Sequence, residues 1–167
     1  TAEGAFVVTN DQVAYGRLGA EWLVEAIGGE GSVLYMRGIE GVPADDDRNA
    51  GFREVMDEYP DIEIKEVFAN WDYTLGGDLA EQELTASTYD GIWTSGIDYT
   101  VVNAFDTTGH EPIPVVGSDN NAFIGQLIDG TPGAVVTNPA VIGGVGTTIA
   151  LQALNGEEPE LETILTP

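Results

Sequence analysis

Short apolar runs alternate with amphipathic helical stretches along the whole chain, and this alternation constrains the fold more than any other feature. The runs at 33–36, 91–94 and 113–117 are long enough for buried strands and too short for helices. Between them, apolar residues recur three and four positions apart, as on one face of a helix. This order predicts a three-layer α/β fold in which helices cover both faces of a central parallel sheet.

The same pattern predicts the remaining elements. Further strands are expected at 5–9, 62–69, 134–137 and 161–165, and helices around 18–27, 48–59, 75–84, 101–105, 123–128 and 141–154. The stretch 141–154 is unusual because it carries three glycines and is apolar around much of its circumference. A helix of this kind needs to be covered on more than one side.

Acidic residues dominate the charge balance. The chain has 29 acidic and five basic residues, which gives a formal charge of −24. Such a surface repels nucleic acid and anionic membranes, so neither is an expected partner. It suits high salt, which screens repulsion, although an ordinary acidic secreted protein is an equal alternative. Unfolding compared at low and molar salt separates the two, since only salt adaptation predicts a gain in stability.

Sequence signals for processing and catalysis are few. The chain begins at Thr1, so we expect processing or trimming, and it has no cysteine for disulfides or thiolate sites. It contains no G-x-S-x-G elbow, phosphate loop or G-x-G-x-x-G turn. The acidic run at 45–49 faintly resembles a calcium loop, but Gly51 comes one place late and Met56 replaces the bidentate acid. His110 is predicted to be a solvated loop residue. We therefore expect no cofactor, no metal and no enzymatic activity.

Three residues are expected just beyond the carboxyl ends of predicted strands. Arg48 starts the helix after strand 33–36, Trp71 follows strand 62–69, and Asp119 follows strand 113–117. Carboxyl ends of parallel strands meet at one edge, where open α/β sheets bind ligands. Each residue has an ordinary alternative: a surface arginine paired with acidic neighbours, a core tryptophan and a helix-capping aspartate. Together, an aromatic face, a donor fork and a carboxylate suit a neutral sugar.

The chain resembles the periplasmic sugar-binding proteins of ABC transporters, of the ribose-binding type. The matching segments are the glycine-containing TNDQVAYGRLGAEWL at 9–23, R-x-x-G-F at 48–52, DGIWTSG at 90–96, PVVGSDN at 114–120 and VTNPAVIGG at 136–144. The resemblance covers nearly the whole chain. It implies a lobe of flavodoxin-like topology, one of two lobes of a type I periplasmic binding protein that clamp a sugar between them.

The resemblance also implies boundaries and partners. Residues 10–136 would form the C-terminal ligand-binding lobe, and 137–167 would hold a crossover, a helix that packs on an N-terminal lobe outside this chain, and a terminal strand. The implied function is a non-catalytic sugar receptor that delivers its ligand to a membrane permease. The implied location is periplasmic or extracellular, with a lipid anchor as one arrangement.

The resemblance implies ligand-binding roles for some residues of this chain, while other positions depart from the family's pattern. Arg48, Trp71 and Asp119 match the family's ligand arginine, stacking aromatic and hydroxyl-binding carboxylate. Ile97 and Thr137 stand where a ribose binder has an asparagine and a glutamine, and Ser118 replaces an aromatic.

These departures make the pocket less polar and put ribose itself in doubt, while Thr137 or Asn138 offers a hinge hydrogen bond. Three alternatives stay open: the effector core of a sugar-responsive repressor, which needs a basic DNA-binding headpiece; a flavodoxin-like enzyme using Asp98 or Asp119; and a receptor domain for a signalling molecule.

Overall fold

The computed structural model describes residues 4–167, which divide into two compact units. The larger unit comprises Gln12–Thr137. The smaller unit joins the residues up to Asp11 with Asn138–Pro167. Each unit is built around its own parallel strand pairing, so each is described separately.

The larger unit contains a five-stranded parallel sheet in the order β3-β2-β4-β5-β6. Counted along this unit, the order is 2-1-3-4-5, which is the flavodoxin-like order. The predicted topology is therefore confirmed. The strands are β2 (Gly31–Arg37), β3 (Ile62–Phe68), β4 (Gly91–Thr94), β5 (Val115–Ser118) and β6 (Gly133–Val136).

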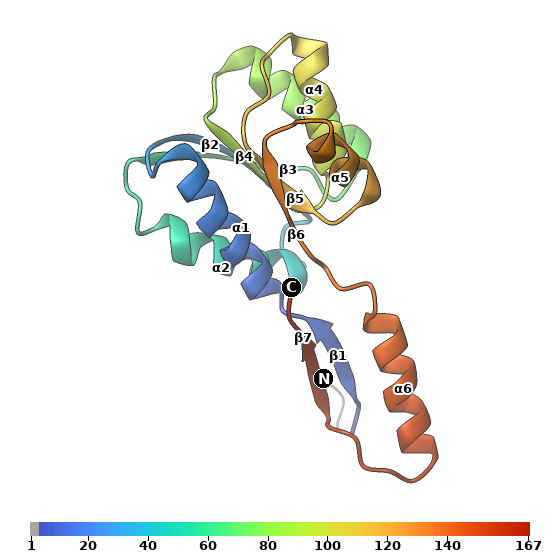
Figure 1. The fold of residues 1–167 in the computed structure, drawn as a ribbon. Helices are drawn as coiled ribbons and strands as arrows, with labels where there is room; N and C mark the ends of the chain where they lie inside the picture. Colours follow the sequence, from blue (N-terminus) through green and yellow to red (C-terminus); the bar gives the residue numbers. More distant parts are fainter. Residues whose placement is uncertain (1–3) are drawn as a thin grey trace. The chain divides into compact units, whose positions relative to one another are not determined.

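Helices cover both faces of this sheet, as the sequence predicted (Figure 1). One face carries α1 (Gln12–Ile27) and α2 (Pro43–Met56). The other carries α3 (Tyr73–Ala86), α4 (Asp98–Thr108) and α5 (Asn121–Ile128). Successive side chains of a strand point to opposite faces, and β2 accordingly sends alternate residues into two separate apolar clusters.

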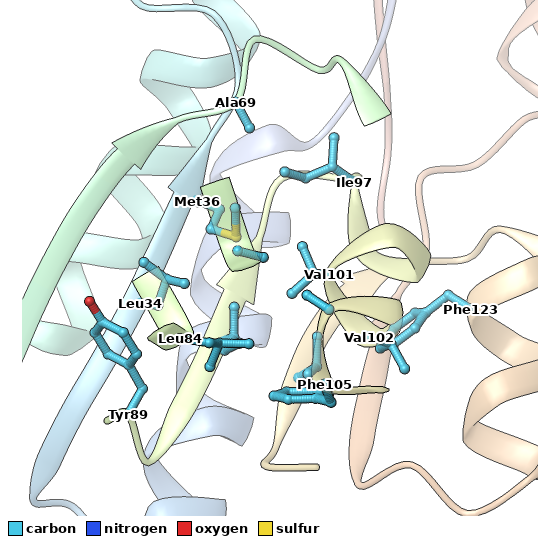
Figure 2. Close-up of a cluster of buried hydrophobic side chains, with 14 residues drawn as sticks. Leu34, Met36, Ala69, Leu84, Tyr89, Ile97, Val101, Val102, Phe105 and Phe123 are labelled. Carbon is cyan, nitrogen blue, oxygen red and sulfur yellow. The ribbon is translucent and has the colours of Figure 1, made fainter. Parts of the chain in front are cut away.

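The cluster beneath α3, α4 and α5 is shown in Figure 2. Leu34 and Met36 of β2 meet Leu84 of α3 and Phe105 of α4 there, all at most 3% exposed. The cluster on the other face is centred on aromatic rings, with Tyr35 stacked on Phe52 at a centroid distance of 3.7 Å and Trp93 edge-on to both. Two full cores explain why the sequence runs of these strands are continuously apolar.

Glycines let α1 and α2 approach backbone to backbone. A Cβ atom at Gly16 would overlap the carbonyl oxygen of Arg48, and one at Gly51 would overlap the carbonyl oxygen of Val13. The glycine of the R-x-x-G-F segment is thus required by helix packing. Because Arg48 precedes Gly51 by almost one turn, the same contact presses its backbone against α1.

The smaller unit contains a parallel pair of strands, β1 (Val7–Asn10) and β7 (Glu162–Leu165), with α6 (Ile142–Leu154) beside β1. Of the residues of α6, only Ile149 is buried. Val141, Leu151 and Leu154 are 64%, 56% and 82% exposed. The predicted helix is therefore present, and the described chain leaves much of its apolar surface uncovered.

We predict that Gly51→Ala destabilises the protein by about 1–3 kcal/mol, because the added methyl group forces α1 and α2 apart. Urea unfolding measures the change. Gly125→Ala is the matched control: a Cβ there meets no atom within 4 Å, and alanine should gain about 0.5–1 kcal/mol in a helix. Equal midpoints for the two variants would contradict the close packing.

Candidate functional site

Arg48 is buried in the second turn of α2, at 6% exposure. The helix begins at Pro43, so the prediction that Arg48 starts it is wrong. Its Nε donates to Oε1 of Gln12 at 2.7 Å, and its Nη1 donates to the carbonyl oxygen and Oγ of Ser95 at 3.2 and 3.0 Å. The guanidinium carbon lies 4.1 Å from the centroid of the Tyr15 ring, within cation–π range. The direct contacts of this cation are therefore all with neutral groups.

The other four basic residues all pair with carboxylates. Arg37 pairs with Asp45 at 2.5 Å, and the remaining pairs are Arg17–Glu54, Arg53–Glu66 and Lys65–Glu83. Arg48 has no ion pair within residues 4–167, and its Nη2 makes no hydrogen bond there. The alternative of a surface arginine paired with its acidic neighbours is therefore wrong. Burial lowers the pKa of Arg48, which still stays charged at neutral pH.

Trp71 lies in a tight turn between β3 and α3. Asn70 and Trp71 both have φ of 55°, and the Asp72 amide donates to the carbonyl oxygen of Ala69 at 2.9 Å. Two consecutive left-handed residues are typical of a type I′ turn, which prefers asparagine and then glycine. Tryptophan in the glycine position carries a strain of about 1–3 kcal/mol, of a kind that gathers at functional sites.

Two contacts fix the Trp71 indole in this conformation. Its Nε1 donates to Ser95 Oγ at 3.1 Å. Its ring lies so close to Gly38, just after β2, that a Cβ there would overlap it. Trp71 is half-buried, whereas the fully buried core tryptophan of this sheet is Trp93. Gly38 and Ser95 thus hold an aromatic ring at the carboxyl edge of the sheet.

Asp119 is exposed, directly after β5. The fully buried carboxylate of Asp98 supports its loop by accepting the Ser118 amide at 2.6 Å and the side-chain amide of Asn120. Burial raises the pKa of Asp98. Asn120, not Asp119, caps α5, since its Oδ1 accepts the Phe123 amide. The alternative of a capping role for Asp119 is therefore wrong.

Tyr15 joins the arginine to this loop. Its Oη lies 2.6 Å from Ser118 Oγ, while its ring faces the guanidinium of Arg48. Burial raises the pKa of Tyr15 to about 12, so it stays neutral at physiological pH. An unbroken chain of contacts therefore runs from Trp71 through Ser95, Arg48 and Tyr15 to the strand end that precedes Asp119.

The other predicted ligand residues lie elsewhere. Ile97 is 1% exposed and points into the cluster beneath α3 and α4, against Gly76 (Figure 2). Thr137 is exposed after β6. Asn138 belongs to the smaller unit, where its Oδ1 accepts the side-chain amide of Asn10 at 2.8 Å.

Sequence reasoning missed Ser95 and Tyr15 as parts of this network. Ser95 directly follows β4, so the strand-end rule that singled out Arg48, Trp71 and Asp119 applied to it equally. Tyr15 carried no comparable signal, because an aromatic residue on a helix face ordinarily belongs to the core.

The part of the chain that the structure describes holds neither a metal-binding cluster nor a membrane-spanning helix. Across residues 4–167, no group of three or more acidic or histidine side chains is arranged to hold a metal ion. His110 is exposed, with Nδ1 2.9 Å from Thr108 Oγ1. None of the helices in this range is long and apolar enough to cross a membrane.

A doubly covered parallel sheet with a polar and aromatic network at its carboxyl edge defines a ligand-binding α/β unit. The family described as periplasmic binding protein domain matches residues 1–158, and the chain belongs to this family.

Relatives and solved structures agree with this assignment. The chain is 30% identical over 116 residues to the D-apiose import binding protein of Actinobacillus succinogenes, covering 67% of this chain and 37% of that protein. It is 22% identical over 157 residues to the ribose import binding protein of Haemophilus influenzae, covering 92% and 54%. The chain thus spans about half or less of the lengths of these relatives.

Two solved structures share the fold. An ABC transporter periplasmic solute binding protein from Actinobacillus succinogenes with bound D-allose is 27% identical, with a TM-score of 0.87 over 96% of this chain and 59% of that one. An ABC transporter solute binding protein from Bacillus halodurans with bound myo-inositol is 23% identical, with a TM-score of 0.89 over 99% and 61%.

We predict that Gly38→Ala displaces the Trp71 indole and destabilises the protein by about 1–3 kcal/mol, because the methyl group needs the space of the ring. Acrylamide quenching of tryptophan fluorescence should increase. The Trp71→Phe variant identifies the share of the signal that belongs to Trp71, and Gly125→Ala is the control. Unchanged quenching in Gly38→Ala would contradict the packing of the ring on Gly38.

Proposed function

We propose that this chain is part of the solute-binding component of an ABC transporter and binds a neutral, monosaccharide-like ligand without transforming it. The observation that carries the proposal is the buried Arg48 with neutral partners only, joined through one serine to Trp71. This pair lies at the sheet edge where α/β proteins bind ligands.

The chemistry of the edge suits a sugar. The face of Trp71 suits the C–H face of a pyranose or furanose ring, and the guanidinium of Arg48 donates in a fixed fork to hydroxyl and ring oxygens. The carboxylate of Asp119 accepts from ligand hydroxyls. A formal charge of −24 disfavours anionic ligands, so we assign a neutral one. Ile97 is turned into the core, so in this proposal Thr137 and Asn138 are the remaining polar candidates.

The proposed protein has a second lobe. Supporting this, the chain spans 37% and 54% of two import binding proteins, and α6 leaves apolar residues exposed beside a two-stranded sheet. A pair of strands has marginal stability alone. Residues 10–136 then form the C-terminal lobe, and 137–167 the crossover and the helix that packs on the other lobe. Strong hydrogen-exchange protection of α6 in dilute, monomeric 167-residue protein would contradict this.

The transport cycle follows from two lobes. The open protein binds sugar on one lobe, closes around it, and the closed form docks on the permease. The name of one neighbour includes "periplasmic solute binding protein", which supports a periplasmic or extracellular location, with lipid anchoring as a variant of the latter.

We predict that the full-length protein binds one or a few sugars from a panel of pentoses, hexoses and polyols. A sugar at a hundred times its Kd should stabilise the fold by about 2.7 kcal/mol, which a thermal-shift assay detects. Arg48→Ala should weaken binding by about 2–3 kcal/mol because buried hydroxyls lose their donors. Arg48→Lys keeps the charge but loses the fork, so it should also weaken binding.

Arg53→Lys is the matched control, because Arg53 lies on the same helix and pairs with Glu66 near the surface. It should bind like the wild type. Wild-type affinity in Arg48→Ala would refute the site. A folded, two-lobed wild type that no sugar stabilises would refute the sugar and favour a signalling-molecule ligand.

A further inference from the structure

Ser95 joins the two groups on which the proposed site depends. Its Oγ accepts from Nε1 of Trp71 at 3.1 Å and from Nη1 of Arg48 at 3.0 Å. In the sequence, Ser95 lies 24 residues from Trp71 and 47 residues from Arg48. A serine hydroxyl has two acceptor lone pairs, and these two donors occupy both.

The position of the Ser95 hydroxyl is set by the sheet. The Ser95 amide donates to the carbonyl oxygen of Met36 at 3.0 Å, which extends the pairing of β4 with β2 by one residue. Gly96, with φ of 95°, then turns the chain toward α4. At 2% exposure, Ser95 is also closely packed. The Trp71 ring and the Arg48 guanidinium therefore both hydrogen-bond to a single oxygen whose position the sheet fixes.

The two donors depend on this oxygen to different degrees. Arg48 keeps the Ser95 carbonyl oxygen and Gln12 if the hydroxyl is removed. The Trp71 indole N–H has no other acceptor among the described residues, and its backbone is strained at φ of 55°. Loss of the hydroxyl should therefore release the ring more than the fork.

We propose that Ser95 is a positioning residue that determines ligand specificity by fixing the angle between the Trp71 ring and the Arg48 fork. The protein then prefers ligands whose oxygens reach the Arg48 guanidinium when the ligand ring is stacked on Trp71. This inference rests on the proposed sugar-binding function, but its structural part does not require a ligand.

The first test uses the ligand-free, full-length protein labelled with ¹⁵N. Trp71→Phe identifies the Trp71 indole N–H resonance by its loss. In Ser95→Ala, this resonance should shift and its hydrogen exchange should accelerate about tenfold or more, because the proton has lost its acceptor. Ser32→Ala, at the opposite edge of the sheet, should leave it unchanged. An unshifted, equally protected resonance in Ser95→Ala would overturn the proposal.

The second test is a double-mutant cycle on affinity, titrated with D-ribose, D-allose, L-arabinose and myo-inositol. Ser95→Ala should weaken binding of the tightest of these sugars about tenfold and reduce the ratio of its affinity to those of the others. In a Trp71→Phe background the same change should cost about twofold or less, because the shared hydrogen bond is already absent. Losses that simply multiply, or an unchanged order and spread of affinities, would overturn the proposal.

The two failures are distinguishable. If no sugar binds the wild type, both the sugar-binding proposal and the role of Ser95 in specificity are refuted. The Trp71 indole resonance still decides whether Ser95 positions Trp71. If sugars bind but Ser95→Ala retains the wild-type profile, only the role of Ser95 is refuted.

Discussion

The burial of a guanidinium that has no ion pair is the physical constraint on which the candidate site depends. Removing a charge from water costs several kcal/mol unless other groups replace its hydration. Around Arg48 that replacement comes from Gln12 on α1, from Ser95 after β4 and from the ring of Tyr15. Gln12 and Tyr15 are in reach because α1 and α2 approach closely at Gly16 and Gly51. Helix packing is thus a condition of the charge's stability.

A second constraint concerns the conformation of Trp71. A left-handed tryptophan survives only where surrounding contacts outweigh its strain. Gly38 supplies the space and Ser95 supplies the acceptor. The Trp71 ring is therefore already ordered when the protein has folded. A ligand that stacks on the ring does not lose binding free energy by ordering it. Pre-organisation of this kind increases affinity without adding contacts.

The sequence predicted the fold well because both faces of the sheet are covered. Strands buried on two sides are continuously apolar, so their runs and the helical periods between them were visible. The strand-end rule also placed Arg48 and Trp71 at one edge, where the structure joins them through Ser95. Directions of side chains were less predictable. Ile97 turns inward against Gly76, and Asn120 rather than Asp119 caps α5, because tertiary contacts decide between neighbouring residues.

Within the larger unit, which the structure describes in full, no carboxylate pairs with Arg48, and this explains why the Arg48 guanidinium remains available to a ligand. The carboxylate of Asp98 is also buried in this unit, and amide groups of Ser118, Asn120 and Tyr99 hydrogen-bond it instead of a cation. Were Asp98 paired with Arg48, the fork would be occupied and the loop before α5 would lose its support. Backbone and side-chain dipoles instead stabilise each charge where it stands. In a chain with so many acidic residues, keeping carboxylates away from one buried arginine is the structural requirement for a donor site that a neutral ligand can use.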